Sequence, residues 1–198
     1  GGTGQYDPFF GLKQAVVFDP FEGTPDPGSP TGAAGAWTAA PDMTGGRWYP
    51  TLLPLADGRV LAVSGLDEKN ELNVVPETYL DGRWTSLSPP PHWPMYAHLF
   101  LLEDGRVFYS GGQYGANNGV RPTVWDPATN ASTDLQGVLP DPQARNQSAS
   151  VLLPPAQDQR VMIMGGGPFD MHDQTGAVAS VAIADLAAPQ PAYRSVAG

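Results

Sequence analysis

Short apolar runs alternate with polar turns along the whole chain, and one such arrangement repeats. Residues 49–65 read Tyr-Pro-Thr-Leu-Leu-Pro-Leu-Ala-Asp-Gly-Arg-Val-Leu-Ala-Val-Ser-Gly, residues 96–112 are a close copy, and residues 148–166 are a looser one. The aspartate of this phrase recurs after 47 and then after 54 residues. No segment sustains the apolar stripe of a helix, so the runs predict β-strands.

A repeat of about 50 residues built from short strands is typical of a kelch-type β-propeller. Each repeat is then one blade of four antiparallel strands. In residues 42–88 the strands are expected at 49–55, 59–64, 77–80 and 83–86, with turns at Asp57-Gly58 and Asp81-Gly82. Asp-Gly between apolar runs indicates a hairpin, because both turn positions favour a positive φ. The sequence therefore predicts an all-β fold.

The repeat divides the chain into about three and a half blades of a seven-bladed propeller. The boundaries are 1–41 for a half blade and 42–88, 89–136 and 137–198 for whole blades. Only the two outer strands of the half blade are expected. Propellers close with about four to eight blades, and an open arc exposes sheet edges. We therefore expect a fragment of a larger propeller, with two copies completing one ring as the alternative.

The composition of the chain argues against several classes of partner and site. Ten basic and twenty acidic side chains give a net charge of −10, which argues against a nucleic-acid partner. No apolar run approaches the ~20 residues of a membrane-spanning helix, and no signal peptide is recognisable at Gly1. The chain has no cysteine, which excludes disulfides, thiolate metal sites and cysteine nucleophiles from these residues.

Strand direction sorts the loops onto two ends of the sheets. One end, which we call the loop face, receives the starts of the innermost strands, the connections between the second and third strands, and the blade-to-blade linkers. Because loops on a rigid scaffold carry function, we expect the site there. The loop face should contain 47–49, 66–76, 92–96, 113–121, 145–147 and 167–177, with 21–35 at the opposite end.

One run is more specific than the repeat itself. Asp42-Met-Thr-Gly-Gly-Arg47-Trp48-Tyr49-Pro-Thr, followed by Asp-Gly-Arg-Val-Leu, resembles the propeller of galactose oxidase and glyoxal oxidase-like copper-radical oxidases. The stretches 144–148 and 160–166 are similar to a following blade of that family, and the resemblance covers essentially all 198 residues.

The resemblance implies that Tyr49 is both a copper ligand and the residue that stores a radical. In the family this tyrosine is cross-linked to a cysteine through a thioether. That cysteine would precede Gly1, and the second tyrosine and both copper histidines would follow Gly198. The copper cofactor is therefore expected in the complete protein, together with the remaining blades and a C-terminal domain. The segment alone is expected to bind no copper and to be inactive.

Two departures bear on the substrate. Galactose oxidases carry a stacking tryptophan where this chain has Leu66-Asp67, and a substrate-contacting arginine where it has His92. The resemblance thus implies a secreted, extracellular oxidase of a primary alcohol or aldehyde that reduces O2 to H2O2, glyoxal oxidase-like rather than galactose-specific. Whether it is an enzyme stays open, and the alternative is a non-catalytic propeller that binds glycans or a protein.

The candidate substrate-binding residues are Arg47, Trp48, His92 and Tyr96. Tyr96 stands eight residues before the repeated aspartate, as Tyr49 does, so both tyrosines could instead be packing residues of the repeat. Arg47 could equally bridge blades. His98 is expected in the core or in the central channel. The acidic segments 67–71 and 170–173 are expected to be solvated, with a Ca²⁺ site as the alternative.

Overall fold

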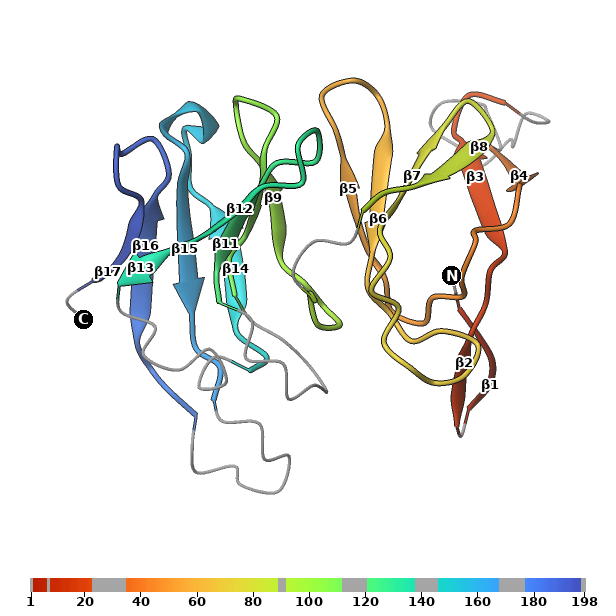
Figure 1. Cartoon of the computed structure of the whole chain (residues 1–198), viewed down its shortest axis with the longest axis horizontal. Helices are drawn as coiled ribbons and strands as arrows, with labels where there is room; N and C mark the ends of the chain where they lie inside the picture. The colour runs from red at the N-terminus through yellow and green to blue at the C-terminus, as the bar shows by residue number, and fades with distance from the viewer. Residues whose placement is uncertain are drawn as a thin grey trace.

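The computed structural model describes residues 2–6, 8–22, 35–88, 92–111, 121–137, 146–167 and 177–196. In these ranges the chain is almost entirely β, with a single 3-10 turn, η2, at Ala156–Asp158 (Figure 1). Most strands lie in four-stranded or larger sheets that stand side by side. The predicted all-β fold is confirmed, and the arrangement is that of a propeller fragment. The number of blades in a closed ring stays a prediction.

The sheet that carries Tyr49 has the predicted strand order. β5 (Thr51–Pro54), β6 (Val60–Val63), β7 (Glu77–Leu80) and β8 (Arg83–Ser86) pair in sequence, all antiparallel. β5 and β6 are shorter than predicted at the loop face, because Tyr49 and Ser64 leave the extended region with φ of 60° and 61°. The regular ladder therefore ends at these two residues, and a single bridge between Trp48 and Leu66 continues it where the site was expected.

The next two sheets continue the pattern with one addition. β9 (Leu99–Leu101), β10 (Val107–Tyr109), β11 (Thr123–Trp125) and β12 (Ser132–Asp134) form the second four-stranded sheet. β14 (Ala149–Leu152), β15 (Arg160–Met164), β16 (Val181–Asp185) and β17 (Ala192–Ser195) form the third. A short strand that the sequence did not predict, β13 (Gln136–Gly137), pairs in parallel with β17. This pairing crosses the boundary predicted after residue 136, and the blade boundaries themselves stay a prediction.

The N-terminal part contains the two expected outer strands and one further hairpin. β3 (Ala15–Asp19) and β4 (Ala36–Ala40) form an antiparallel pair. The unpredicted hairpin of β1 (Thr3–Tyr6) and β2 (Phe9–Gly11) extends to the loop face (Figure 1). Its last residue, Gly11, donates its N–H to the Asp67 carbonyl at 2.8 Å, and a side chain there would collide with the Leu66 carbonyl. The hairpin is thus held against the loop that follows β6.

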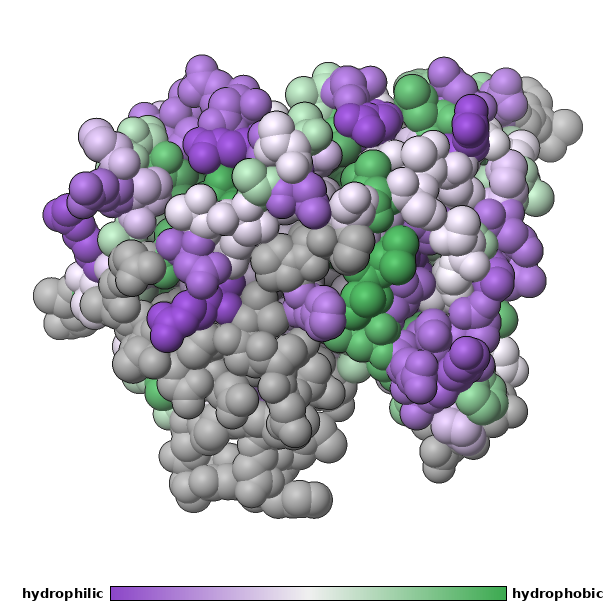
Figure 2. All heavy atoms as spheres, in the orientation of Figure 1, coloured by the Kyte–Doolittle hydropathy of each residue, from purple (hydrophilic) through white to green (hydrophobic). Residues whose placement is uncertain are grey.

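Two apolar cores join neighbouring sheets. One lies between the β5–β8 and β9–β12 sheets around Leu61 and Trp125, and the other lies between the β9–β12 and β14–β17 sheets around Phe108 and Ile163. Figure 2 shows hydrophobic side chains gathered over β5 and β6 and mostly hydrophilic ones at the turn ends. None of the described residues forms a helix long and apolar enough to cross a membrane.

Candidate functional site

Tyr49 sits at a backbone position that the repeat defines. Its φ is 60°, and the equivalent residues Tyr96 and Gln147 have φ of 58° and 55°. Each precedes the first strand of its sheet. Left-handed backbone is unfavourable for a residue with a side chain, by roughly 1–2 kcal/mol, so three repeats maintain the same strained turn. The turn conformation is therefore common to the three repeats, whereas the side chain at the turn is not the same in all three.

The ring of Tyr49 belongs to a continuous aromatic array. Phe9 of β2 stacks on Trp48 with ring centroids 3.8 Å apart and planes 8° from parallel. Trp48 stacks on Tyr49 at 4.2 Å and 29°, and Tyr49 meets Tyr96 at 5.0 Å and 41°. Tyr49 and Tyr96 keep 46% and 41% of their surface exposed. The structure thus brings together three of the predicted site residues, and adds Phe9, which has no counterpart in the repeat.

The turn at Tyr49 explains how two consecutive rings can stack. In a strand, adjacent side chains point to opposite faces, so Trp48 and Tyr49 would diverge. The positive φ of Tyr49 brings its ring back over Trp48. A tryptophan therefore stacks on Tyr49 even though Leu66-Asp67 occupies the position where the resemblance places one. Because Phe9 and Tyr49 cover both faces of Trp48, only the edge of its indole is left for a ligand.

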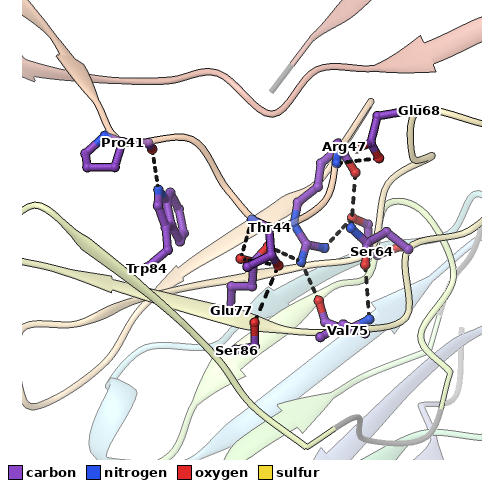
Figure 3. A network of polar contacts seen from close by, with 11 residues as sticks. Pro41, Thr44, Arg47, Ser64, Glu68, Val75, Glu77, Trp84 and Ser86 are labelled. Atoms are coloured by element: carbon purple, nitrogen blue, oxygen red, sulfur yellow. Dashed lines mark hydrogen bonds and ion pairs between the residues drawn. The ribbon is translucent and has the colours of Figure 1, made fainter.

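Arg47 is fully buried rather than presented to a ligand. Its guanidinium pairs with Glu77 Oε2 at 2.9 Å, and neither side chain is exposed (Figure 3). It also donates to the carbonyl oxygens of Ser64, at 2.9 Å, and Val75. Burial lowers the pKa of Arg47, and the carboxylate of Glu77 opposes that shift. These side-chain partners of Arg47 all belong to the β5–β8 sheet, so its guanidinium is held within one sheet and not between two blades. The substrate contact of Arg47 stays a prediction.

The segment before Tyr49 has a second, exposed anchor. Glu68 accepts a hydrogen bond from Gly46 N at 2.9 Å and pairs with Lys13 Nζ at 2.7 Å. The hydrogen bond from Lys13, followed by that from Gly46, lowers the pKa of Glu68 to about 2. The acidic loop is thus occupied with internal contacts: Asp67 Oδ1 accepts from the backbone N–H of Lys69 and of Glu71.

The histidines contribute little to this arrangement. His92 is exposed and lies beside buried Trp93, while His98 is partly buried and its Nδ1 has no hydrogen-bond partner among the described residues. Burial lowers the pKa of His98. Arg145, His172 and the acidic segment 170–173 lie outside the described residues.

The described residues of the loop face supply only part of a ligand set for a metal ion. Within the described ranges, no group of three or more His, Cys, Asp or Glu side chains is placed to hold a metal ion. What the loop face offers is the exposed phenol of Tyr49, with a second phenol, that of Tyr96, on the neighbouring ring. A phenolate can bind Cu²⁺, so Tyr49 fits as one ligand, and the rest of the set would have to come from elsewhere.

A separate cavity does not overlap with this site. It has a volume of about 400 Å³ and lies between the β3–β4 pair and the β5–β8 sheet. Its lining is mainly apolar, including Val16, Leu52 and Trp84. None of the sequence-predicted site residues lines it.

Comparison with known proteins shows which solved structures have a similar fold. No protein-family model matches the chain, and no curated protein matches it. Among solved structures, it is similar to a fungal alcohol oxidase described as showing catalytic diversity among the AA5 family and as being in complex with copper, with a TM-score of 0.59 and 19% identity. The match covers 82% of this chain and 34% of the oxidase, so the chain spans about a third of that protein. At this identity the likeness is one of fold: the chain resembles part of a copper-containing alcohol oxidase.

Proposed function

We propose that the chain is part of a copper-radical oxidase in which Tyr49 is the metal-binding and radical-storing residue. The observation that carries the proposal is the exposed phenol of Tyr49, held in a strained turn and stacked on Trp48 at 4.2 Å. The similarity of the fold to a copper-containing alcohol oxidase supports it, as does the resemblance of the Arg47-Trp48-Tyr49 run.

The proposed reaction removes two electrons and two protons from a primary alcohol or an aldehyde hydrate, and O2 takes up both to give H2O2. Copper, when bound, would supply one-electron redox chemistry next to the oxidisable phenol. Tyr49 would hold the metal through its phenolate oxygen. The stacked indole of Trp48 would exclude water from one face of the phenol ring and orient it.

Parts of the site must come from outside these residues. The thioether would require a cysteine, and the chain contains none. We propose that this cysteine, the other copper ligands and the protein partners of these sheets belong to further blades and a C-terminal domain of the same polypeptide, acting outside the cell.

The accessible side chains favour a small substrate. Arg47 is buried and both faces of Trp48 are covered, so His92 and Tyr96 are the predicted substrate residues that remain exposed. Neither offers the bidentate charged recognition that an arginine would give a sugar hydroxyl pair. We therefore propose a small alcohol or aldehyde, glyoxal oxidase-like rather than galactose-specific.

The decisive experiment measures metal and radical together. The polypeptide that contains these residues is loaded with copper and oxidised, and metal content, the radical absorption band and H2O2 release with primary alcohols and aldehydes are recorded. We expect Tyr49→Phe to abolish the radical band and H2O2 release, and Tyr79→Phe, a tyrosine in the same sheet, to preserve them. A radical band that persists in Tyr49→Phe would refute the assignment.

One observation favours a second candidate function. Tyr49 and Tyr96 present adjacent, exposed rings, which could act as a platform for a neutral glycan or a protein without any chemistry. Glycan-array binding that is lost in Tyr96→Ala, by a protein that takes up no copper, would establish this function in place of the oxidase.

A further inference from the structure

We propose that the buried ion pair of Arg47 and Glu77 is a positioning device for Tyr49. It fixes the segment 44–48, which carries the ring of Trp48 and leads directly into Tyr49. The link to catalysis rests on the proposed function, but the positioning itself can be measured in protein without metal.

The guanidinium of Arg47 ties this segment to three points of one sheet. It donates to the carbonyl oxygen of Ser64 at the end of β6, to that of Val75 ahead of β7, and to the carboxylate of Glu77, the first residue of β7 (Figure 3). Ser64 and Glu77 are themselves buried. A single side chain two residues before Tyr49 is therefore held by β6 and β7 together.

The carboxylate of Glu77 holds the other end of the same segment. Its Oε1 accepts from the backbone N–H of Thr44 at 2.8 Å and from the Thr44 hydroxyl at 2.7 Å, while its Oε2 pairs with Arg47 (Figure 3). Between these points, Gly46 N donates to Glu68 and Gly46 O accepts from Asn73 Nδ2 at 3.1 Å. The segment is thus bound along its length and not only at its ends.

Tyr49 depends on this segment because, among the described residues, its phenol is held by ring contacts and not by a hydrogen bond. Trp48 exchanges both backbone hydrogen bonds with Leu66, at 2.8 and 2.9 Å. Within the part of the chain that the structure describes, the hydroxyl of Tyr49 makes no hydrogen bond. The ring is therefore oriented by its backbone turn and by its contacts with Trp48 and Tyr96.

A stability role alone does not account for such a pair. Taking two charges out of water offsets most of their attraction, and replacing a buried ion pair by apolar residues of similar size is often neutral. What a buried pair with several hydrogen bonds can add is a single defined geometry. Here that geometry is imposed on the residues immediately before the exposed phenol.

The test uses site-resolved nitration of tyrosines by tetranitromethane, which reports the accessibility of each phenol. The main variant is Arg47→Met with Glu77→Leu, which removes both charges while keeping the volume. Thr44→Val is a milder variant that removes one hydrogen bond to Glu77. The matched control is Asp57→Asn with Arg59→Gln, which removes an exposed ion pair of the same sheet at its opposite end.

We expect the nitration rate of Tyr49 relative to Tyr79 to rise about three- to tenfold in the double variant, the change that corresponds to losing one ring-pair contact. Thr44→Val should shift the ratio in the same direction by less, and the control should leave it unchanged. A purely structural pair would lower the unfolding midpoint without changing this ratio in the folded protein. An unchanged ratio in the folded double variant overturns the proposal; if that variant does not fold, an unchanged ratio in Thr44→Val does so.

The nitration experiment also tests the positioning of Tyr49 independently of the proposed oxidase function. If the unsubstituted protein takes up no copper, the oxidase proposal fails while the nitration ratio still decides whether Arg47 and Glu77 position Tyr49.

Discussion

Tyr49 and Tyr96 occupy the same position in successive repeats, and their rings meet at 5.0 Å across the junction of two sheets. Both have a left-handed backbone and both remain over 40% exposed. The fold thus places two phenols side by side at the loop face by repeating one turn. Nearby, Thr51 Oγ1 of β5 donates a hydrogen bond to the carbonyl of Ala97, two residues before β9, at 2.9 Å.

The third copy of this turn offers a test of its strain. Gln147 has φ of 55°, is exposed, and lies outside the aromatic array. Gly adopts this conformation without a Cβ penalty, so Gln147→Gly should be neutral or stabilise the fold by up to about 1 kcal/mol, despite the greater freedom of the unfolded chain. Urea denaturation measures the change. A loss of more than about 1 kcal/mol would show that the Gln147 side chain contributes contacts of its own.

A buried hydroxyl adds a hydrogen bond to the apolar core that joins the second and third sheets. Tyr193 of β17 donates its O–H to the Ser110 carbonyl at 2.7 Å, and both residues are buried. Tyr193→Phe keeps the ring packing but leaves that carbonyl short of a donor, so we expect a loss of about 1–2 kcal/mol in the free energy of unfolding. Tyr79→Phe, at a partly exposed tyrosine, is the control and should change stability by less than about 0.5 kcal/mol. Equal losses in the two variants would contradict this assignment.

Local turn chemistry made the strands predictable. Asp81-Gly82 forms a hairpin turn with a positive φ at both residues, as predicted, whereas in the Asp57-Gly58 turn only Gly58 has a positive φ. β7 and β8 begin and end where the sequence placed them. The hairpin of β1 and β2 was missed because residues 3–11 have no counterpart in the repeat. β13 was missed because its parallel pairing with β17 joins residues over 50 positions apart.

The site was only partly predictable for a related reason. The run at Arg47-Trp48-Tyr49 drew attention to the right segment, but its chemistry depends on distant partners. Arg47 and Glu77 are 30 positions apart, and neither residue type indicates burial, because charged side chains are mostly exposed. The stacking of Trp48 on Tyr49 depends on a positive φ at a residue other than glycine, which sequence patterns rarely reveal.

The exposed anchor at Glu68 should make stability depend on pH in acid. Lys13 and the Gly46 N–H lower its pKa to about 2 from 4.5, so the folded state releases this proton more readily than the unfolded one. The contribution of the Glu68 carboxylate to the free energy of unfolding is therefore complete above pH 4.5 and is lost as the pH falls toward 2. Because the pair is partly exposed and screened by solvent, we expect Glu68→Gln to cost less than about 1 kcal/mol at neutral pH. The difference between the two proteins, followed by urea midpoints, should shrink in acid and with added salt; a difference independent of pH would contradict the ion-pair account.

His98 should produce the opposite kind of titration nearer neutrality. Burial lowers the pKa of His98 below 6.5, and its Nδ1 has no partner in the part of the chain that the structure describes, so the folded state resists the proton that the unfolded state accepts. Stability should therefore fall as pH drops through 6.5 and level off once pH is below the pKa of the folded protein. His98→Gln removes this titration and should flatten the unfolding midpoint between about pH 7 and pH 5, above the range where most carboxylates titrate. Gln147→Gly, which changes no titrating group, serves as the control and should retain the slope of the unsubstituted protein. If the slope survives in His98→Gln, the titrating group lies elsewhere, and burial of the His98 imidazole does not set the pH dependence of this fold.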